Sequence, residues 1–167
     1  MGCLGVHFAL TEEEVAKLRS CKDDAARLEY LQNDIEERYF KKEPEWKAET
    51  DKAWDAIHRA LTDGKLAYDN GKYPLNHVIL GGEPIYAEGD YIMALKTPDQ
   101  VRAIAGVLSE VGEDALRRGY FAMDTKEYGF PLTEEDFKYT WEWFSGLKPF
   151  WKNAASAGRY ILFTADQ

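Results

Sequence analysis

The sequence predicts an α+β fold: a single domain over residues 1–167, in which a small sheet packs against several helices. Apolar, β-prone segments occupy residues 2–10 and 159–165, while most of the chain between them shows helical periodicity. A chain of 167 residues that is 45% hydrophobic can fill one core, and it contains no repeat or linker. We therefore expect the sheet to combine N-terminal, central and C-terminal strands.

The N-terminal part predicts one strand and two helices. GCLGVHFAL (2–10) has apolar or small residues at nearly every position, which favours a strand covered on both faces. Thr11 and Glu14 then have the spacing of a capping box, so a short helix begins there. A second helix is predicted over residues 23–41, where apolar residues recur at helical spacing. Pro44 ends this region, because proline cannot donate the next helical hydrogen bond.

The centre of the chain predicts one helix and two short strands. DKAWDAIHRALTD (51–63) has apolar residues at helical spacing and is followed by Gly64, a common C-terminal stop. Residues 64–76 are rich in turn formers, so we expect a loop. HVIL (77–80) and DYIMALK (90–96) are short and apolar, and both predict strands.

The C-terminal part predicts three helices and a final strand. The first helix begins at TPDQ (97–100), which combines a cap, a proline in the first turn and a capping-box glutamine. A short helix is expected over residues 113–122 and a long one over 133–157. Pro149 is expected to kink or split the long helix. RYILFTA (159–165) is strongly β-prone.

The charge of the chain limits its partners. Lys and Arg number 21 against 30 Asp and Glu, which gives a net charge of −9. Such a surface repels the phosphates of nucleic acids and of anionic membranes, so neither is expected as a partner. A basic protein, a cation or a neutral small molecule fits better. The structural alternative is that the acidity only keeps the protein soluble. Two cysteines, no signal peptide and no long apolar run together predict a cytoplasmic protein with free thiols.

Four polar residues share one face of the helix predicted to begin at Asp51. At about 100° per residue, Asp55, His58 and Thr62 fall within about 40° of Asp51. Trp54 lies beside them on the apolar stripe. The polar face therefore borders the buried face, where a side chain can meet both water and the core.

This polar face allows several roles. A histidine beside carboxylates is a stronger base, so His58 with Asp51 or Asp55 fits general-base catalysis. The same groups, with Trp54 and Thr62, also fit a ligand-binding surface. In the structural alternative, the aspartates stabilise the helix N-terminus through its dipole and His58 packs against Trp54. A single histidine does not complete an HExxH-type motif and neither cysteine has a CxxC partner, so no metal or cofactor is predicted.

A second candidate region is ILGGEP (79–84). Glycines allow a ligand to approach the backbone closely, but the segment lacks both phosphate-binding glycine motifs. A turn after a strand is the simpler interpretation. Glu83 follows the two glycines and His77 lies two residues before the segment, and we include both as ligand-binding candidates that would share a pocket with His58.

The long C-terminal helix has more aromatic residues than one buried stripe needs. One aromatic group falls within about 80° of arc, and a second stripe lies beside it. Deep burial of the whole helix would account for both. The alternative is that the second stripe is an interface with another protein or a second copy of this chain, since Trp and Tyr are favoured there. The interface candidates are Tyr139, Trp143 and Phe150.

Four segments resemble the YfbM-like family, a bacterial domain of unknown function: MGCLGVHFAL (1–10), DKAWDAIHRALTDG (51–64), ILGG (79–82) and ALKTPDQVRAIAGVL (94–108). Their order and spacing match across most of the chain, whereas residues 110–167 match only loosely. The resemblance implies a single α+β domain but no reaction, because the family has no established activity. It places six residues at motif positions: Asp51, Lys52, Trp54, His58, Leu61 and Thr62. The chain departs from the family pattern at Cys3, His7 and Asp63.

Two classes of function fit these observations. The first is a non-enzymatic binding protein, favoured by the missing catalytic signature, the acidic surface and the aromatic excess. One form of it is an immunity-like protein that neutralises a basic partner. The alternative is a small-molecule hydrolase or metal-assisted enzyme that uses His58 as a base with Asp51 or Asp55. We favour the first class.

Overall fold

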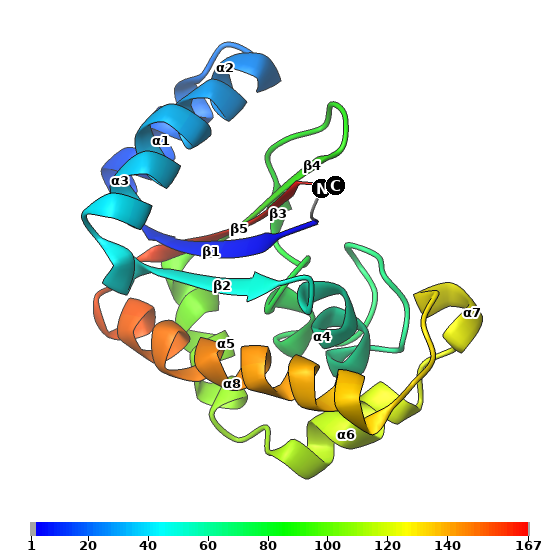
Figure 1. The fold of residues 1–167 in the computed structure, drawn as a ribbon. Coiled ribbons are helices and arrows are strands. Elements are labelled where there is room, and N and C mark those ends of the chain that lie inside the picture. The colour runs from blue at the N-terminus through cyan, green and yellow to red at the C-terminus, as the bar shows by residue number, and fades with distance from the viewer. Residues whose placement is uncertain (1–2, 167) are drawn as a thin grey trace.

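The fold is organised around a five-stranded antiparallel sheet in the order β2-β1-β5-β4-β3 (Figure 1). A computed structural model describes residues 3–166. The strands are β1 (Gly5–Leu10), β2 (Lys47–Asp51), β3 (Glu83–Pro84), β4 (Tyr91–Lys96) and β5 (Tyr160–Asp166). The first and last strands of the sequence are therefore neighbours, and β5 is the middle strand of the sheet.

Helices cover both faces of this sheet (Figure 1). One face carries α1 (Glu12–Ser20), α2 (Asp24–Tyr30), a π-helical turn η1 (Leu31–Glu36) and α3 (Glu37–Lys41). The other face carries α4 (Trp54–Leu61), α5 (Pro98–Leu108), α6 (Glu113–Phe121) and α8 (Glu134–Ser156). Two short 3-10 helices, η2 (Pro44–Trp46) and η3 (Leu75–His77), and the four-residue α7 (Thr125–Tyr128) complete the order. This arrangement confirms the α+β prediction.

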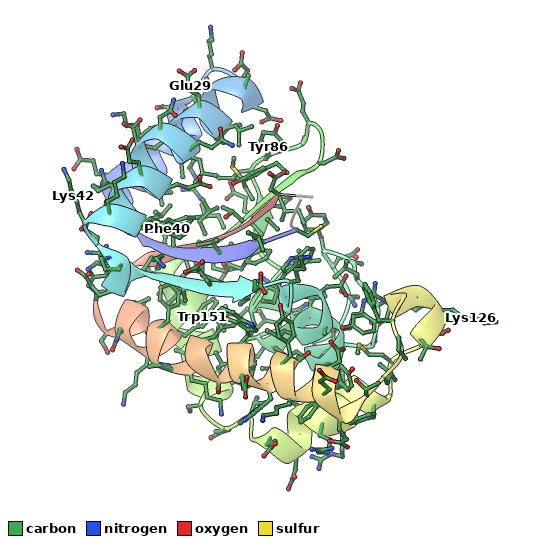
Figure 2. The ribbon with its side chains drawn as sticks, in the orientation of Figure 1. Glu29, Phe40, Lys42, Tyr86, Lys126 and Trp151 are labelled. Carbon is green, nitrogen blue, oxygen red and sulfur yellow. The ribbon has the colours of Figure 1, made fainter. Side chains whose placement is uncertain are left out.

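Each face of the sheet has its own apolar core. Phe8 and Leu10 of β1 pack with Leu31 and other residues of the α1–α3 layer. Ala9 belongs to the opposite core, which includes Trp151 of α8. Trp151 points from α8 toward the sheet in Figure 2. Because successive strand residues face opposite sides, two cores explain why residues 2–10 are apolar at nearly every position.

The predicted helix starts are confirmed where a local motif defines them. Thr11 and Glu14 form both hydrogen bonds of a capping box at the start of α1. Thr97 and Gln100 form the same pair at the start of α5. Residues 23–41 form a continuous helical region whose middle turn is π-helical. No helix within residues 3–166 combines the length and the apolar composition needed to cross a bilayer.

The strand predicted at residues 77–80 is wrong. The 3-10 helix η3 and turns occupy this segment, and two side chains from the sheet hold its carbonyls. The His7 ring Nε2 lies 2.8 Å from the Val78 carbonyl, and Lys96 Nζ donates to the Ile79 carbonyl. These contacts satisfy the backbone in place of a strand partner, so the apolar run is buried without joining the sheet.

The helix predicted over residues 51–63 begins three residues later than expected. Asp51 has a φ of 48° and ends β2, a strand that was not predicted. The left-handed conformation of Asp51 turns the chain from the strand toward α4. Asp51 therefore precedes α4 and does not lie on its first turn.

Pro149 does not split α8, which runs without interruption for 23 residues. Pro149 lies on the exposed side of the helix. Ser145, whose carbonyl loses its usual N–H partner to the proline, is partly exposed. The predicted break is therefore wrong, because the cost of the missing hydrogen bond is small on this side.

Candidate functional site

A cavity of about 530 Å³ opens between α4, α7 and the first turns of α8. We call it the aromatic cleft and define it by six lining residues: Trp54, Asp55, Tyr128, Phe130, Asp136 and Tyr139. Cys3, Lys52 and Leu66 complete the lining. The volume lies within the range of about 300–1,000 Å³ that is typical of ligand pockets.

Local interactions hold the residues of two cleft walls in place. Trp54 begins α4, and its indole N–H donates a 2.7 Å hydrogen bond to the Cys3 carbonyl, which fixes the ring. Asp136 and Tyr139 lie three residues apart on the first turns of α8, so they share one face of the helix. Thr133 caps this helix by accepting from the Asp136 N–H at 3.0 Å.

The Tyr139 hydroxyl joins α8 to the end of β2. It donates to the Asp51 carboxylate at 2.6 Å and accepts from the Lys52 N–H at 3.2 Å. Burial, followed by the hydrogen bond to Asp51, raises the pKa of Tyr139 to about 12, so the phenol keeps its proton. A left-handed aspartate at the mouth of a cleft is the kind of backbone outlier that occurs at binding sites.

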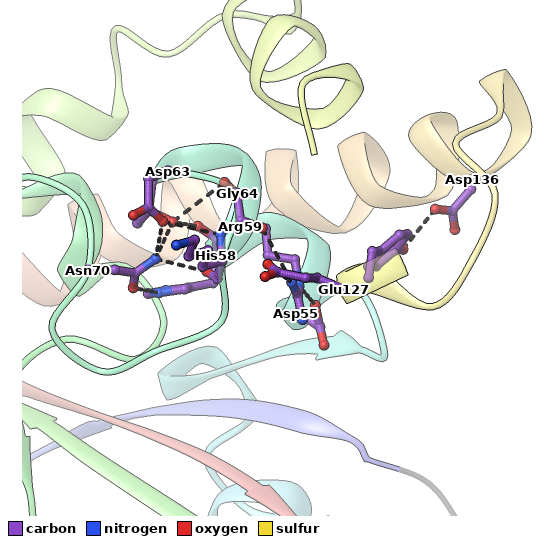
Figure 3. A network of polar contacts seen from close by, with 11 residues as sticks. Asp55, His58, Arg59, Asp63, Gly64, Asn70, Glu127 and Asp136 are labelled. Carbon is purple, nitrogen blue, oxygen red and sulfur yellow. Dashed lines mark hydrogen bonds and ion pairs between the residues drawn. The ribbon is translucent and has the colours of Figure 1, made fainter. Parts of the chain in front are cut away.

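Asp136 is fixed by two other tyrosines. The hydroxyls of Tyr120 and Tyr128 both donate to its Oδ2 atom, at 2.5 and 2.8 Å. Burial, and next the hydrogen bond to Asp136, raises the pKa of both phenols. Asp136 in Figure 3 lies at the end of this polar network, beside α7. Within residues 3–166 its Oδ1 atom has no hydrogen-bond partner, so one oxygen of the carboxylate is available to a ligand.

Asp55 is paired with Arg59 one turn along α4, at 2.6 Å. Arg59 is 7% exposed and also lies 3.9 Å from Glu127 of α7. Figure 3 shows these three side chains together. The cleft and its immediate surroundings therefore contain four carboxylates (Asp51, Asp55, Glu127 and Asp136) against two cations (Lys52 and Arg59), a net negative charge.

His58 lies inside the core rather than at the edge of the helix. Its side chain is 1% exposed, its Nε2 atom lies 2.8 Å from Asn70 Oδ1, and it does not line the cleft. Burial lowers its pKa, which keeps the ring neutral. The helical spacing predicted His58 on a polar face with Asp55. The loop after α4 folds back over His58, however, whereas Asp55 lines the cleft. The expected location at the border with water is therefore wrong for this ring.

Thr62 belongs to the same covering loop. Its hydroxyl donates to the His58 carbonyl at 2.6 Å and accepts from the Asn70 amide at 3.1 Å. The Asn70 amide also donates to Asp63 at 2.6 Å, as Figure 3 shows. His58 and Thr62 together hold the loop closed, which is a structural arrangement.

His77 and Glu83 are each held by residues other than His58. His77 Nδ1 lies 2.7 Å from Asn76 Oδ1, and its ring packs edge-on against Tyr73. Glu83 lies on the edge strand β3 and pairs at 2.9 Å with Arg19 of α1. No group of three or more His, Cys, Asp or Glu side chains in the described part of the chain is arranged to hold a metal ion.

The three interface candidates have different environments. Phe150 is 5% exposed and belongs to the core between α8 and the sheet, so it cannot contact a partner in this fold. Trp143 is half-buried, and its ring centroid lies 6.5 Å from that of Tyr139. Of the second aromatic stripe, only Tyr139 lines the cleft.

Three cleft residues were missed at the sequence level: Tyr128, Phe130 and Asp136. Asp136 lies in the long helix predicted over residues 133–157, but it was not predicted as a site residue. The signal that could have found them is the alternation of aromatic and acidic residues in YGFPLTEEDFKY (128–139), a pattern expected for a cation-binding surface.

Comparison with known proteins supports the fold and gives no activity. The model of the family described as "Domain of unknown function (DUF1877)" matches residues 1–164. The crystal structure of a protein of unknown function, YfbM from Escherichia coli, is similar with a TM-score of 0.66 and 20% sequence identity, over 97% of this chain and 99% of that chain. No curated protein matches the sequence.

Proposed function

This chain belongs to the DUF1877 family of unknown function, and from that premise we propose that it is a non-enzymatic binding protein. Its partner is a basic protein, and a cationic side chain of that partner enters the aromatic cleft. The observation that carries the proposal is a cavity of about 530 Å³ that is lined by aromatic rings and by two carboxylates, Asp55 and Asp136.

The aromatic walls suit a cation. A Lys or Arg group within about 6 Å of an aromatic ring is attracted by the negative ring face, more strongly where water is excluded. Trp54, Tyr128 and Tyr139 contribute rings from three helices, so a cation would meet rings on several sides. Lys52 at the rim is exposed and can extend into water.

The carboxylates give the cleft its selectivity. Oδ1 of Asp136 and Oδ2 of Asp55 have no hydrogen-bond partner within residues 3–166, because the partners of both side chains use the other oxygen. An entering ammonium or guanidinium group can donate to these oxygens, and charge-assisted hydrogen bonds of this kind are strong. The net charge of −9 attracts a basic partner over longer distances.

The hydrolase alternative receives no support from the position of His58. A general base must reach the substrate proton, and this ring is 1% exposed and hydrogen-bonded to Asn70. An immunity-like role, in which the domain blocks a basic partner, is one biological form of the proposed binding. A cytoplasmic location fits two free cysteines.

NMR titration with the capped tripeptides Gly-Arg-Gly and Gly-Gln-Gly tests the proposal. We expect the arginine peptide to shift the indole resonance of Trp54, the affinity to fall as salt is added, and the glutamine peptide to have no effect. Equal binding of both peptides, or arginine binding that does not depend on salt, would rule out a cation site in the cleft.

Two variants locate the site. Asp136→Asn keeps an acceptor for Tyr120 and Tyr128 and removes the charge, so affinity for the arginine peptide should fall about tenfold. Asp99→Asn removes the same charge from α5, where the side chain is 89% exposed and does not line the cleft, and should leave affinity nearly unchanged. A similar loss in both variants would mean that net charge alone causes binding.

A further inference from the structure

The outer edge of the aromatic cleft carries an apolar side chain that the fold leaves uncovered. Phe130 is 64% exposed, yet it lines the cleft, and its ring centroid lies 5.4 Å from that of Tyr128. Phe121, whose ring centroid lies 4.8 Å from that of Tyr120, is 39% exposed. An exposed aromatic side chain beside a charged pocket is typical of a surface that contacts another protein.

We infer that the cleft binds an extended peptide segment of its partner, in which an apolar residue lies two positions from the basic residue. This inference rests on the proposed function and specifies the class of ligand. The basic side chain lies between Trp54, Asp136 and Tyr139. The apolar side chain covers Phe130.

The spacing of the two subsites supports this register. In an extended peptide, side chains two residues apart point to the same side and are separated by about 7 Å. Neighbouring side chains point to opposite sides, so a residue directly next to the basic one would face away from the protein. Tyr128 joins the two subsites, because its hydroxyl donates to Asp136 at 2.8 Å and its ring centroid lies 5.4 Å from that of Phe130. The subsites are therefore neighbours, as an i, i+2 pair of side chains requires.

A free small cation would leave Phe130 unused. The carboxylates and the inner rings satisfy the charged group, and a ligand of amino-acid size has no atoms left to cover an exposed ring at the rim. Covering Phe130 requires a ligand that extends out of the cleft. A peptide segment of the basic partner meets this requirement and also matches the negative charge around the cleft.

The test compares capped tripeptides by isothermal titration calorimetry: Arg-Ser-Leu and Leu-Ser-Arg, against Arg-Ser-Ser and Ser-Ser-Arg. We expect at least one of the two leucine peptides to bind about tenfold more tightly than its serine counterpart, because it removes the Phe130 ring from water. Equal affinity for leucine and serine peptides overturns this inference and leaves the cation site intact. Arginine-independent binding overturns both.

Phe130→Ser locates the apolar subsite. In this variant the ratio of the affinities for the leucine and serine peptides should fall from about ten to about one. Phe40→Ser is the matched control, because Phe40 is 43% exposed on α3, at the far end of the molecule from α7 in Figure 2. A leucine preference that survives in Phe130→Ser would place the apolar contact elsewhere and overturn the inference. Equal thermal midpoints confirm that the variants fold.

The two cysteines provide an independent readout on the unmodified chain. Cys3 lines the cleft, whereas Cys21 lies at the C-terminal end of α1, on the other side of the sheet. A bound leucine peptide should slow alkylation of Cys3 and leave the rate at Cys21 unchanged. Protection of neither thiol at saturating peptide, or equal protection of both, would show that the peptide binds outside the cleft.

Discussion

The Tyr139 hydroxyl donates a 2.6 Å hydrogen bond to the Asp51 carboxylate, joining residues that are 88 positions apart in the sequence. The bond links the end of β2 to the first turns of α8, the two elements that meet at the mouth of the aromatic cleft. Because Tyr139 also accepts from the Lys52 N–H, a single phenol fixes the segment that leads into α4.

Tyr139→Phe should lower the free energy of unfolding by about 1–2 kcal/mol, since it removes a charge-assisted hydrogen bond and leaves an N–H without its acceptor. Urea denaturation measures the change. Tyr73→Phe is a matched control, because Tyr73 is 53% exposed and far less constrained. A loss in Tyr139→Phe no larger than that in the control would mean that the bond to Asp51 contributes nothing to stability.

Two substitutions distinguish the contribution of the left-handed backbone at Asp51 to stability from the contribution of its carboxylate. Asp51→Gly removes the hydrogen bond but accepts a φ of 48° without strain, whereas Asp51→Ala loses both the bond and the tolerance of aspartate for this region. We expect Asp51→Ala to be less stable than Asp51→Gly by about 1 kcal/mol. Thermal or urea unfolding of both variants checks this order. The reverse order would show that the left-handed conformation is not required for folding.

Lys96 should make stability depend on pH at and above neutrality. Burial holds its pKa well below the ordinary value of 10.5, so between these values the unfolded chain binds one more proton than the folded one. Stability therefore rises with pH, by up to about 1.4 kcal/mol per unit. Lys96→Met should flatten this slope between pH 7 and 10, measured by urea unfolding. Lys152→Met, at an exposed position, is the control and should keep the slope. Equal slopes in the two variants would contradict a lowered pKa of Lys96.

His7 should make the stability of the fold depend on pH in the acidic range as well. Burial, and next the proximity of Lys96, lowers its pKa from 6.5 to about 3. The unfolded chain therefore holds the extra proton between these two values, and stability falls as pH falls across that window. His7→Gln keeps a donor near the Val78 carbonyl and cannot be protonated. Its unfolding free energy should change less between pH 6 and 4 than that of the unmodified chain, by about 1.4 kcal/mol per unit.

The Asn70 side chain should stabilise the loop after α4 without affecting ligand binding. Its amide group connects His58, Thr62, Asp63 and Lys65, none of which lines the cleft. Asn70→Ala should cost about 1–3 kcal/mol and speed proteolysis within residues 62–71, while affinity for the arginine peptide stays within about twofold. The exposed Asn153→Ala is the control. A large loss of affinity in Asn70→Ala would indicate that the ligand binds near His58 and not in the aromatic cleft.

Local motifs predicted the elements that they define on their own. The capping boxes at Thr11 and Thr97 satisfy backbone groups within a few residues, so they act in the same way in a peptide and in the fold. The strand at residues 77–80 was mispredicted because its carbonyls are held by His7 and Lys96, which are distant in sequence. β2 was missed because KAETD has few apolar residues and gains its partner only from β1.

The candidate site was predicted only in part, for a similar reason. Helical spacing placed Trp54 and Asp55 correctly beside each other, and both line the cleft. Helical spacing alone could not show that residues 62–70 would cover His58, because it considers the helix without the rest of the chain. Tyr128 and Asp136 reach the cleft only through the packing of α7 and α8 against α4, which no local period encodes.

The central position of β5 also has a consequence for synthesis. While residues 160–166 are still inside the ribosome, β1 lacks one neighbour and β4 lacks its main one, so the two halves of the sheet cannot join. The growing polypeptide must therefore keep both apolar layers uncovered until β5 emerges, and it is exposed to chaperones and aggregation throughout that time. Shortened forms that end before residue 160 should consequently be insoluble or degraded.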